Sequence, residues 1–438
     1  GSFSFGAGFS SQDSFVANGS LSQENLFGRG YSARLSADIG GRTQRYFLSI
    51  SDPYFLGSNF SAGLTLFSTQ INFQDFKQDQ TGADFVLGHS VTEDHRTRGF
   101  LRYSWASRDI EQDSNVNAAG VIFRELIQDS LTSSLMGLAI NSDTRNDRLS
   151  PSSGYLWAAS LEFAGLGFFT QFFRAEASGS WYLGAPWWLL DGSTFVISGR
   201  VGYALPLNDV SDYEFLEVPD GFLETVDGNV RLLQAIDDDL TLPLSERYFL
   251  GGLGEFQLRG FKARSVGPRR AILRKQGDGL YIPVGRDIIF VQADDHDVPV
   301  SPGFPDAVPI TVCTGSPVTG GNGNTRCNDI SDKDIEDFED LDETDVIGGN
   351  KFISSSLEYR FPISETLGLQ GLVFLDTGNA FSEGENLFDV TEWRYGTGFG
   401  VQWFSPFGPL AVILGFPLDP LEDENSPVFE FSVGGQGF

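Results

Sequence analysis

Apolar and polar residues alternate with a period of two through most of the chain. The clearest segments are 30–40, 59–71, 171–184, 349–362 and 392–405. Successive side chains of a β-strand point to opposite faces, so each segment is predicted to be a strand with one apolar face and one polar or small face. No comparable run has the 3.6-residue spacing of an amphipathic helix, and the pattern therefore predicts an all-β protein.

Sixteen such segments follow one another along the chain. Most are longer than the strands of soluble proteins, which average about 5 to 6 residues, and match membrane-spanning strands of about 9 to 11 residues. An even number of strands allows closure into a barrel without a free edge. The chain is therefore predicted to be a 16-stranded antiparallel transmembrane β-barrel, a single domain over 1–438. The predicted strands are 2–10, 13–23, 30–40, 44–52, 59–71, 82–91, 96–109, 131–143, 154–165, 171–184, 193–205, 349–362, 367–381, 392–405, 408–418 and 427–438.

A large soluble β-sandwich would alternate equally well, and side-chain chemistry favours the membrane barrel over it. Aromatic residues gather at segment ends, for example at Trp181 and Trp403, as in the interfacial girdles of membrane barrels. Charged residues such as Arg174 and Glu176 lie on the face opposite the apolar one within a single long strand. A water-filled lumen accommodates such charges.

One connection, 206–348, is much longer than the others. It carries 28 acidic and 12 basic residues, which accounts for about half of the net charge of −30. In a barrel, a connection of this length is predicted to form an extracellular cap, a plug in the lumen, or both. Its densest acidic stretch, 329–345, resembles a calcium-binding string but lacks the glycine placement of an EF-hand loop, so a solvated face is favoured over a metal site.

Both cysteines of the chain, Cys313 and Cys327, lie in this connection. Their isolation within one stretch rich in Gly, Pro and Asn favours a disulfide formed in an oxidising compartment over two free surface thiols. Closing a loop of this length contributes roughly 3 kcal/mol in the chain-entropy model.

Composition excludes several function classes. With a net charge of −30 and a pI of about 4.3, no basic face is available for nucleic acid. Two Cys and three His are too few for a structural zinc site or an iron–sulfur cluster, and no metal or other cofactor is expected. Mean hydropathy is −0.12 and no apolar run is long enough for a membrane helix, which leaves alternating strands as the way to span a bilayer.

Several short motifs together resemble one known family. Leu258-Arg259-Gly260-Phe261 lies within the long connection and is similar to the (V/L)RGF signature of the BamA-type outer-membrane assembly proteins. Matching stretches occur in family order over nearly the whole chain, at Gly1–Gly6, Asn146–Tyr155, Ser356–Tyr359, Phe374–Gly378 and Gln402–Leu410. The cysteine pair downstream of the RGF sequence resembles the family as well.

The resemblance implies a function that composition and periodicity do not show. It implies the central insertase of the β-barrel assembly machinery in the outer membrane of Gram-negative bacteria, working without nucleotide or other cofactor. The implied partners are unfolded outer-membrane β-barrel clients, outer-membrane lipids and accessory lipoproteins, the last bound mainly through upstream periplasmic POTRA domains that these 438 residues lack. The related TamA branch, which assembles a narrower client set, is the alternative, and the number of POTRA domains would discriminate between the two.

In the family, the arginine of the RGF sequence reaches the inner barrel wall. Here, residue parity places Glu358 on the polar face of its strand and Asp376 on the polar face of the next one, so both carboxylates are predicted to face the lumen. Arg259 is expected to bind them with forked hydrogen bonds and thereby hold the loop, with Gly260 allowing a tight backbone and Phe261 packing on the wall. The alternative is that Glu358 simply pairs with Arg360.

The second expected feature is a weak seam between the first and last strands, where the resemblance implies a lateral gate. Glycine weakens strand pairing, and a client strand could then add to the exposed edge, although ordinary terminal fraying is the alternative. Phe438 differs in parity from the other aromatic residues of the last segment, which indicates a bulge or a terminal ring that does not face lipid. The expected gate residues are Phe3, Phe5, Gly6, Gly8, Phe429, Phe431, Gly434, Gly435 and Phe438.

Two rival functions come from other classes. A hydrolase would need a nucleophile, a base and an orienting group, and His89, His95 and His296 have no serine motif nearby, so the chain is not expected to be an enzyme. A passive porin would suit a charged lumen, but a long plug containing the RGF sequence argues against free flow. Conductance measurements separate a porin from an assembly protein.

Overall fold

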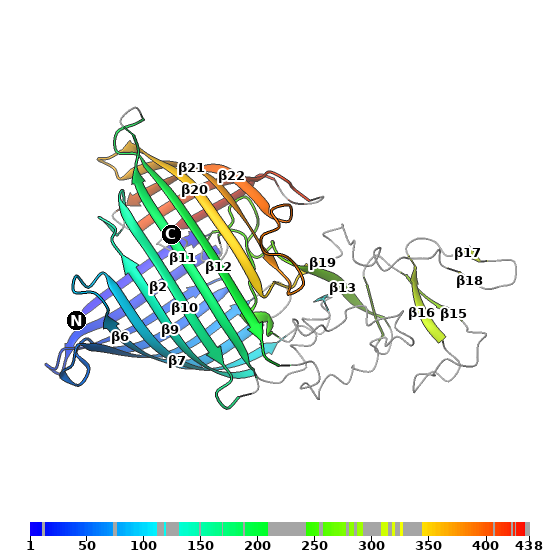
Figure 1. Cartoon of the computed structure of the whole chain (residues 1–438), viewed down its shortest axis with the longest axis horizontal. Helices are drawn as coiled ribbons and strands as arrows, with labels where there is room; N and C mark the ends of the chain where they lie inside the picture. The colour runs from blue at the N-terminus through cyan, green and yellow to red at the C-terminus, as the bar shows by residue number, and fades with distance from the viewer. Residues whose placement is uncertain are drawn as a thin grey trace.

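In the computed structural model, sixteen antiparallel strands form one closed barrel in which consecutive barrel strands lie side by side (Figure 1). The first and last strands complete the circle. The barrel strands are β1 (Ser2–Ser10), β2 (Ser14–Leu26), β3 (Tyr31–Gly40), β4 (Thr43–Asp52), β5 (Phe60–Asn72), β6 (Lys77–Ser90), β7 (Thr97–Glu111), β9 (Leu131–Asp143), β10 (Gly154–Ala164), β11 (Phe172–Gly184), β12 (Thr194–Pro206), β20 (Lys351–Ser364), β21 (Leu369–Phe381), β22 (Arg394–Ser405), β23 (Gly408–Pro417) and β24 (Val428–Val433).

The structure describes most of the barrel and part of the long connection. No helix in this described part is long and apolar enough to cross a membrane. The described residues are 1–10, 14–72, 77–111, 118–119, 131–148, 150–168, 170–186, 189–208, 242–253, 257–276, 280–283, 287–291, 308–313, 318–319, 325–326, 344–405, 408–421, 424 and 426–433.

The number, order and direction of the barrel strands agree with the sequence prediction, and two strand boundaries are corrected. The strand predicted at 82–91 begins at Lys77. Its first five residues, 77–81, are all polar and do not alternate, so the sequence pattern did not include them. The strand predicted at 13–23 continues to Leu26 after a register shift that follows Gln23. A bulge of this kind interrupts the alternation from which the boundary was predicted.

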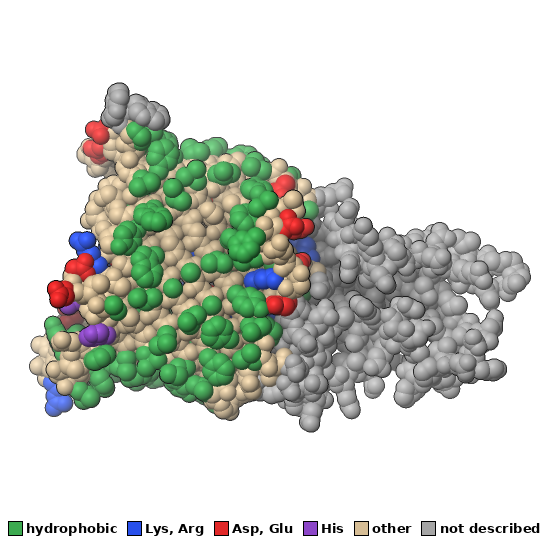
Figure 2. All heavy atoms as spheres, in the orientation of Figure 1, with side chains coloured by type: hydrophobic (Ala, Val, Ile, Leu, Met, Phe, Trp, Pro, Cys, Tyr) green, Lys and Arg blue, Asp and Glu red, His purple; other side chains and the backbone are tan. Residues whose placement is uncertain are grey.

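The outer face of the barrel is apolar, as the alternation predicted. Directly paired outward residues such as Leu138 and Leu161 are 59% and 51% exposed. Figure 2 shows hydrophobic side chains over this wall and most of the charged ones towards its two ends. Because bilayer hydrocarbon accepts apolar side chains but not unpaired charges, this distribution suits a barrel wall in contact with lipid.

The connection between β12 and β20 has one part inside the barrel and another beyond it. A short 3-10 helix, η4 (Leu244–Glu246), packs against the inner wall together with the described residues up to Val266, among which Tyr248, Leu258 and Phe261 are at most 2% exposed. Figure 1 shows β13 and β19 beyond the end of the barrel at which β12 ends. The strands of this connection are β13 (Arg269–Gln276), β14 (Leu280–Pro283), β15 (Asp287–Val291), β16 (Val308–Cys313), β17 (Val318–Thr319), β18 (Thr325–Arg326) and β19 (Thr344–Val346), and β8 (Ala118–Ala119) pairs with β13.

Candidate functional site

The Leu258–Phe261 sequence forms the inner end of the connection, deep in the lumen. Gly252 and Leu258 pair as an antiparallel bridge, with backbone N–H groups donating in both directions over 3.2 Å. The Gly252 N–H also donates to the carbonyl of Phe261 at 3.0 Å. These bonds tie both sides of the tip together, so that the residues between 252 and 261 that the structure describes are held as one turn.

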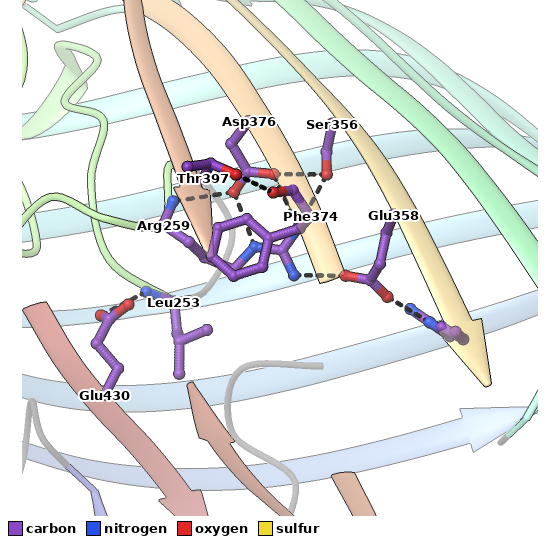
Figure 3. Close-up of polar contacts among 9 residues, drawn as sticks. Leu253, Arg259, Ser356, Glu358, Phe374, Asp376, Thr397 and Glu430 are labelled. Atoms are coloured by element: carbon purple, nitrogen blue, oxygen red, sulfur yellow. Dashed lines mark hydrogen bonds and ion pairs between the residues drawn. The ribbon is translucent and has the colours of Figure 1, made fainter. Parts of the chain in front are cut away.

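Arg259 occupies the centre of a buried polar cluster on the inner wall (Figure 3). Its guanidinium donates to both oxygens of Asp376 on β21, from Nε to Oδ2 and from Nη2 to Oδ1, each at 2.8 Å. Nη1 donates to Glu358 on β20, and Nη2 also donates to the hydroxyl of Ser356 at 2.9 Å. The fork geometry of a guanidinium suits this shared recognition of two carboxylates, which a lysine ammonium could not reproduce.

Burial intensifies the electrostatics of this cluster. Arg259 is 2% exposed and Asp376 is fully buried. Burial alone lowers the pKa of Arg259, but the hydrogen bonds and negative charges of Asp376 and Glu358 outweigh it, so that pKa lies above its ordinary value. The guanidinium carbon also lies 3.8 Å from the ring centre of Phe374, a cation–π contact. Arg259 therefore stays charged and is paired with two carboxylates.

Glu358 pairs with Arg259 and with Arg360 at the same time. Arg360 Nε donates to Oε1 of Glu358 while Arg259 binds Oε2. The two expectations from the sequence, a loop contact or a pair within the strand, therefore both describe real bonds of this carboxylate.

Glycines let the loop tip approach the wall closely. Gly260 has φ +100°, and a Cβ there would lie 3.1 Å from the backbone of Phe416 on β23. A Cβ on Gly396 of β22 would overlap the carbonyl oxygen of Arg259, and one on Gly415 of β23 would lie 2.5 Å from Gly260 N. The tip thus rests directly on the backbone of two barrel strands, which only glycine at these positions permits.

Phe261 packs in the core of the loop and meets a cation from the wall. The guanidinium carbon of Arg394, at the start of β22, lies 4.8 Å from the Phe261 ring centre. Arg394 also donates to Glu424, in the segment between β23 and β24, at 2.6 Å. Through these contacts the RGF sequence touches or indirectly reaches every strand from β20 to β23.

A second ionic contact, which the sequence analysis missed, holds another part of the loop. Glu246 in η4 accepts from Arg108 on β7 and, at 2.6 Å, from Arg174 on β11. Tyr248 then donates from its hydroxyl to Glu176 on β11 at 2.7 Å. Burial raises the pKa of Glu246, but the two guanidinium groups outweigh it and lower that pKa to about 2. The sequence pattern placed Arg174 on the lumen-facing side of its strand, but it did not show that Arg174 binds the loop.

The seam between β1 and β24 has a single registered pair among the described residues, Ser10 with Ser432. On its other side β1 pairs with β2 along its whole length, including Phe5 with Gly19 and Gly8 with Val16. Side chains of the expected gate residues point outward at Phe3 and Phe5, which are 73% and 70% exposed. Phe429 is also exposed and Phe431 is half-buried beside it.

Some sequence predictions fall outside the described residues. They are the pairing of Cys313 with Cys327, the acidic stretch 329–343, the gate residues Gly434, Gly435 and Phe438, and His296. Of the other histidines, His89 stacks on Phe60 and His95 hydrogen-bonds Ser90. No group of three His, Cys, Asp or Glu side chains suited to a metal ion occurs in the part of the chain that the structure describes.

Comparison with known proteins assigns the family. The model of the Omp85 superfamily domain matches residues 25–436, nearly the whole chain. The chain belongs to the Omp85 superfamily. Two curated Omp85 relatives are similar along the chain: the outer membrane protein assembly factor BamA of Nitratidesulfovibrio vulgaris, 23% identical over 98% of this chain, and that of Neisseria meningitidis serogroup B, 22% identical over 99%. The resemblance stated from the sequence motifs is thereby confirmed.

One solved structure agrees with the fold. BamA from Haemophilus ducreyi, lacking POTRA domains 1–3, superposes with a TM-score of 0.65 at 18% identity, covering 99% of this chain and 69% of that one. At this identity the likeness supports the barrel architecture. The chain spans only 41% and 46% of the length of the two curated relatives.

Proposed function

We propose that the chain is the membrane barrel of an outer-membrane protein assembly factor of a Gram-negative bacterium. In this proposal it folds and inserts β-barrel clients through a lateral gate between β1 and β24. The curated relatives carry that function in their names, and the fold matches that of the solved BamA from Haemophilus ducreyi. Unfolded outer-membrane proteins, bilayer lipids and accessory lipoproteins would be its partners.

The observation that carries the proposal is the match of nearly the whole chain to the Omp85 superfamily domain, together with its likeness to relatives named as assembly factors. The first and last barrel strands, β1 and β24, meet where the ring closes, with Ser10 and Ser432 as register partners. A wall that parts at one place exposes unpaired backbone N–H and C=O groups there. A client strand can satisfy these groups by adding to the edge, which lowers the cost of bringing its own backbone into hydrocarbon.

The inner loop has a complementary role in the proposal. Arg259 fixes it to β20 and β21 and Glu246 fixes it to β7 and β11, and each bond involves a charge that is at least nine-tenths buried. The loop fills part of the lumen and keeps its shape while the seam changes. This arrangement fits an assembly factor better than a porin, which needs an unobstructed lumen.

A disulfide across the seam tests the gate. The full-length protein, with its upstream domains, is reconstituted in lipid vesicles and given a denatured barrel client. Ser10→Cys with Ser432→Cys, whose Cα atoms are register partners, should form a disulfide, since such partners lie within disulfide reach. Oxidation is expected to abolish client insertion, and reduction to restore it.

The matched control places the same crosslink elsewhere. Ser32 and Ser51 are register partners on β3 and β4, with their hydroxyl oxygens 2.7 Å apart. Both double-cysteine proteins carry Cys313→Ser and Cys327→Ser, so that each forms only the intended bond. The control should insert clients at the parental rate whether oxidised or reduced. Full activity of the oxidised seam variant would contradict the gate.

A further inference from the structure

The last barrel strand has a contact with the inner loop that neither the family motif nor the sequence pattern indicated. Glu430 on β24 faces the lumen and is 4% exposed. Its carboxylate Oε1 accepts a hydrogen bond of 3.0 Å from the backbone N–H of Leu253 in the loop. Figure 3 shows this bond beside the Arg259 cluster, with Glu430 extending from its strand towards the loop.

Leu253 belongs to the same turn as Arg259. It follows Gly252, whose backbone bonds to Leu258 and Phe261 close the turn. Its side chain packs against a buried apolar cluster of Leu372, Phe374 and Ile413. The turn is therefore anchored to β20 and β21 by ion pairs and to β21 and β23 by apolar packing, and the Leu253 N–H reaches the next strand, β24.

Burying a carboxylate at this position in the wall costs free energy. Burying an ionisable group is unfavourable unless it is paired or hydrogen-bonded, and an apolar or hydroxyl side chain would fill the space at lower cost. Oε2 of Glu430 has no hydrogen-bond partner among the described residues, so the Leu253 bond is the one described hydrogen bond of this carboxylate. The bond joins β24 to the inner loop, and we infer that this link is the role of the carboxylate.

The position of the bond relates it to the seam. Glu430 lies two residues before Ser432, the residue of β24 that pairs with β1, and its own register partner is Ile413 on β23. The Leu253 bond therefore fixes β24 from the lumen side, close to the point where the strand meets β1. A strand held in this way can remain in place when its seam neighbour moves.

We propose that Glu430 is a positioning residue for the last strand. Its bond to the Leu253 N–H anchors β24 to the inner loop, so that β24 keeps its place and β1 is the strand that moves when the seam opens. The inference rests on the proposed gate, which it deepens by assigning the fixed and the moving side. The turn that carries Arg259 thereby sets the position of the edge presented to a client strand.

The test compares Glu430→Ala with Glu430→Gln in the full-length protein in lipid vesicles. The glutamine side-chain carbonyl can still accept from Leu253, whereas alanine cannot. Hydrogen exchange is measured at the Leu253 amide. In the same backgrounds, Ser10→Cys and Ser432→Cys are added and the yield of the disulfide between these two positions is measured. Alanine should accelerate exchange about tenfold or more and lower the disulfide yield, and glutamine should restore both towards the parent.

Glu365→Ala is the matched control, because Glu365 is an exposed carboxylate in the turn after β20. It should change neither reading, and retained heat-modifiable migration shows that each variant is folded. Parental exchange in Glu430→Ala, or a glutamine variant no better than the alanine one, would overturn the assignment. Client insertion by the oxidised seam variant is scored separately. If insertion persists, the gate itself is contradicted. If insertion is lost but Leu253 exchange is unchanged in Glu430→Ala, only the role of Glu430 is contradicted.

Discussion

Arg259 binds Asp376 through its backbone as well as its side chain. The Arg259 N–H donates to Oδ2 at 3.0 Å, and the same oxygen accepts from Nε of that residue at 2.8 Å, across 117 positions of the chain. One carboxylate thus fixes both the path of the loop and the direction of the guanidinium. The contact specifies a single seating of the loop on β21, because a shifted backbone would break both bonds together.

Replacing Arg259 should release the loop tip. Arg259→Ala leaves Asp376 as a buried charge without its cation and Glu358 with Arg360 alone, and breaking a buried ion pair in this way typically costs about 3 to 5 kcal/mol. We expect faster proteolysis within the connection and a lower rate of client insertion. Arg259→Lys should have a proteolysis rate and an insertion rate between those of the parent and of Arg259→Ala, because an ammonium cannot bind both carboxylates in a fork. Parental protease protection in Arg259→Ala would contradict the proposed role of the contact.

Adding a methyl group under the tip should have a similar effect without changing any charge. Gly396→Ala places a Cβ against the carbonyl oxygen of Arg259, so the tip must move away from β22. The loop should become more sensitive to protease. Gly19→Ala on β2 is the control, since a Cβ there meets nothing within 4 Å. Equal protease sensitivity of the two variants would show that close approach at β22 is unimportant.

The Glu246 contact should depend on pH in one direction. Its pKa is about 2 in the folded protein and about 4.3 in an unfolded chain, so the folded state binds the proton less tightly. The resulting stabilisation is complete above the unfolded value and is lost as pH falls from about 4.3 towards 2. Thermal unfolding of the parent and of Glu246→Gln measures it.

At neutral pH the Glu246→Gln variant should unfold at a lower temperature, because Arg108 and Arg174 lose their shared carboxylate. The difference between the two proteins should shrink as the pH approaches about 2, where the parent is protonated as well. A difference that stays constant over this range would show that the charge of Glu246 does not stabilise the loop.

Conductance offers a test of the seated loop that is independent of clients. In planar bilayers the parent protein should show small steady currents, because the connection occupies part of the lumen. Asp376→Ala removes the main partner of Arg259 and should increase the open-channel current or its fluctuations. Large, steady currents from the parent would instead support a porin.

The barrel was predictable because its signal is local. Alternation within each strand gives the face of every residue, which is why Glu358 and Asp376 were correctly expected to point into the lumen before any partner was known. The start of β6 was missed because Lys77 and its neighbours are polar on both faces. The short strands of the long connection were missed for a related reason: they pair with one another and carry no long alternating run.

The contacts of the loop show where such reasoning ends. Arg259 was identified by a motif, whereas Glu246 and Glu430 have no motif around them. Their partners lie 72 positions away at Arg174 and 177 away at Leu253. No periodicity links residues so far apart, and the choice among the lumen charges follows from where the loop runs through the closed barrel.

The inner part of the loop binds the wall at two sets of strands: Glu246 meets Arg108 on β7 and Arg174 on β11, and Arg259 meets Glu358 on β20 and Asp376 on β21. It therefore links these strands from the lumen side and resists changes in their spacing. Any increase in the circumference of the barrel, such as the addition of a strand, is then taken up between strands that the loop does not link. The seam between β1 and β24, where the proposed gate lies, is one such place.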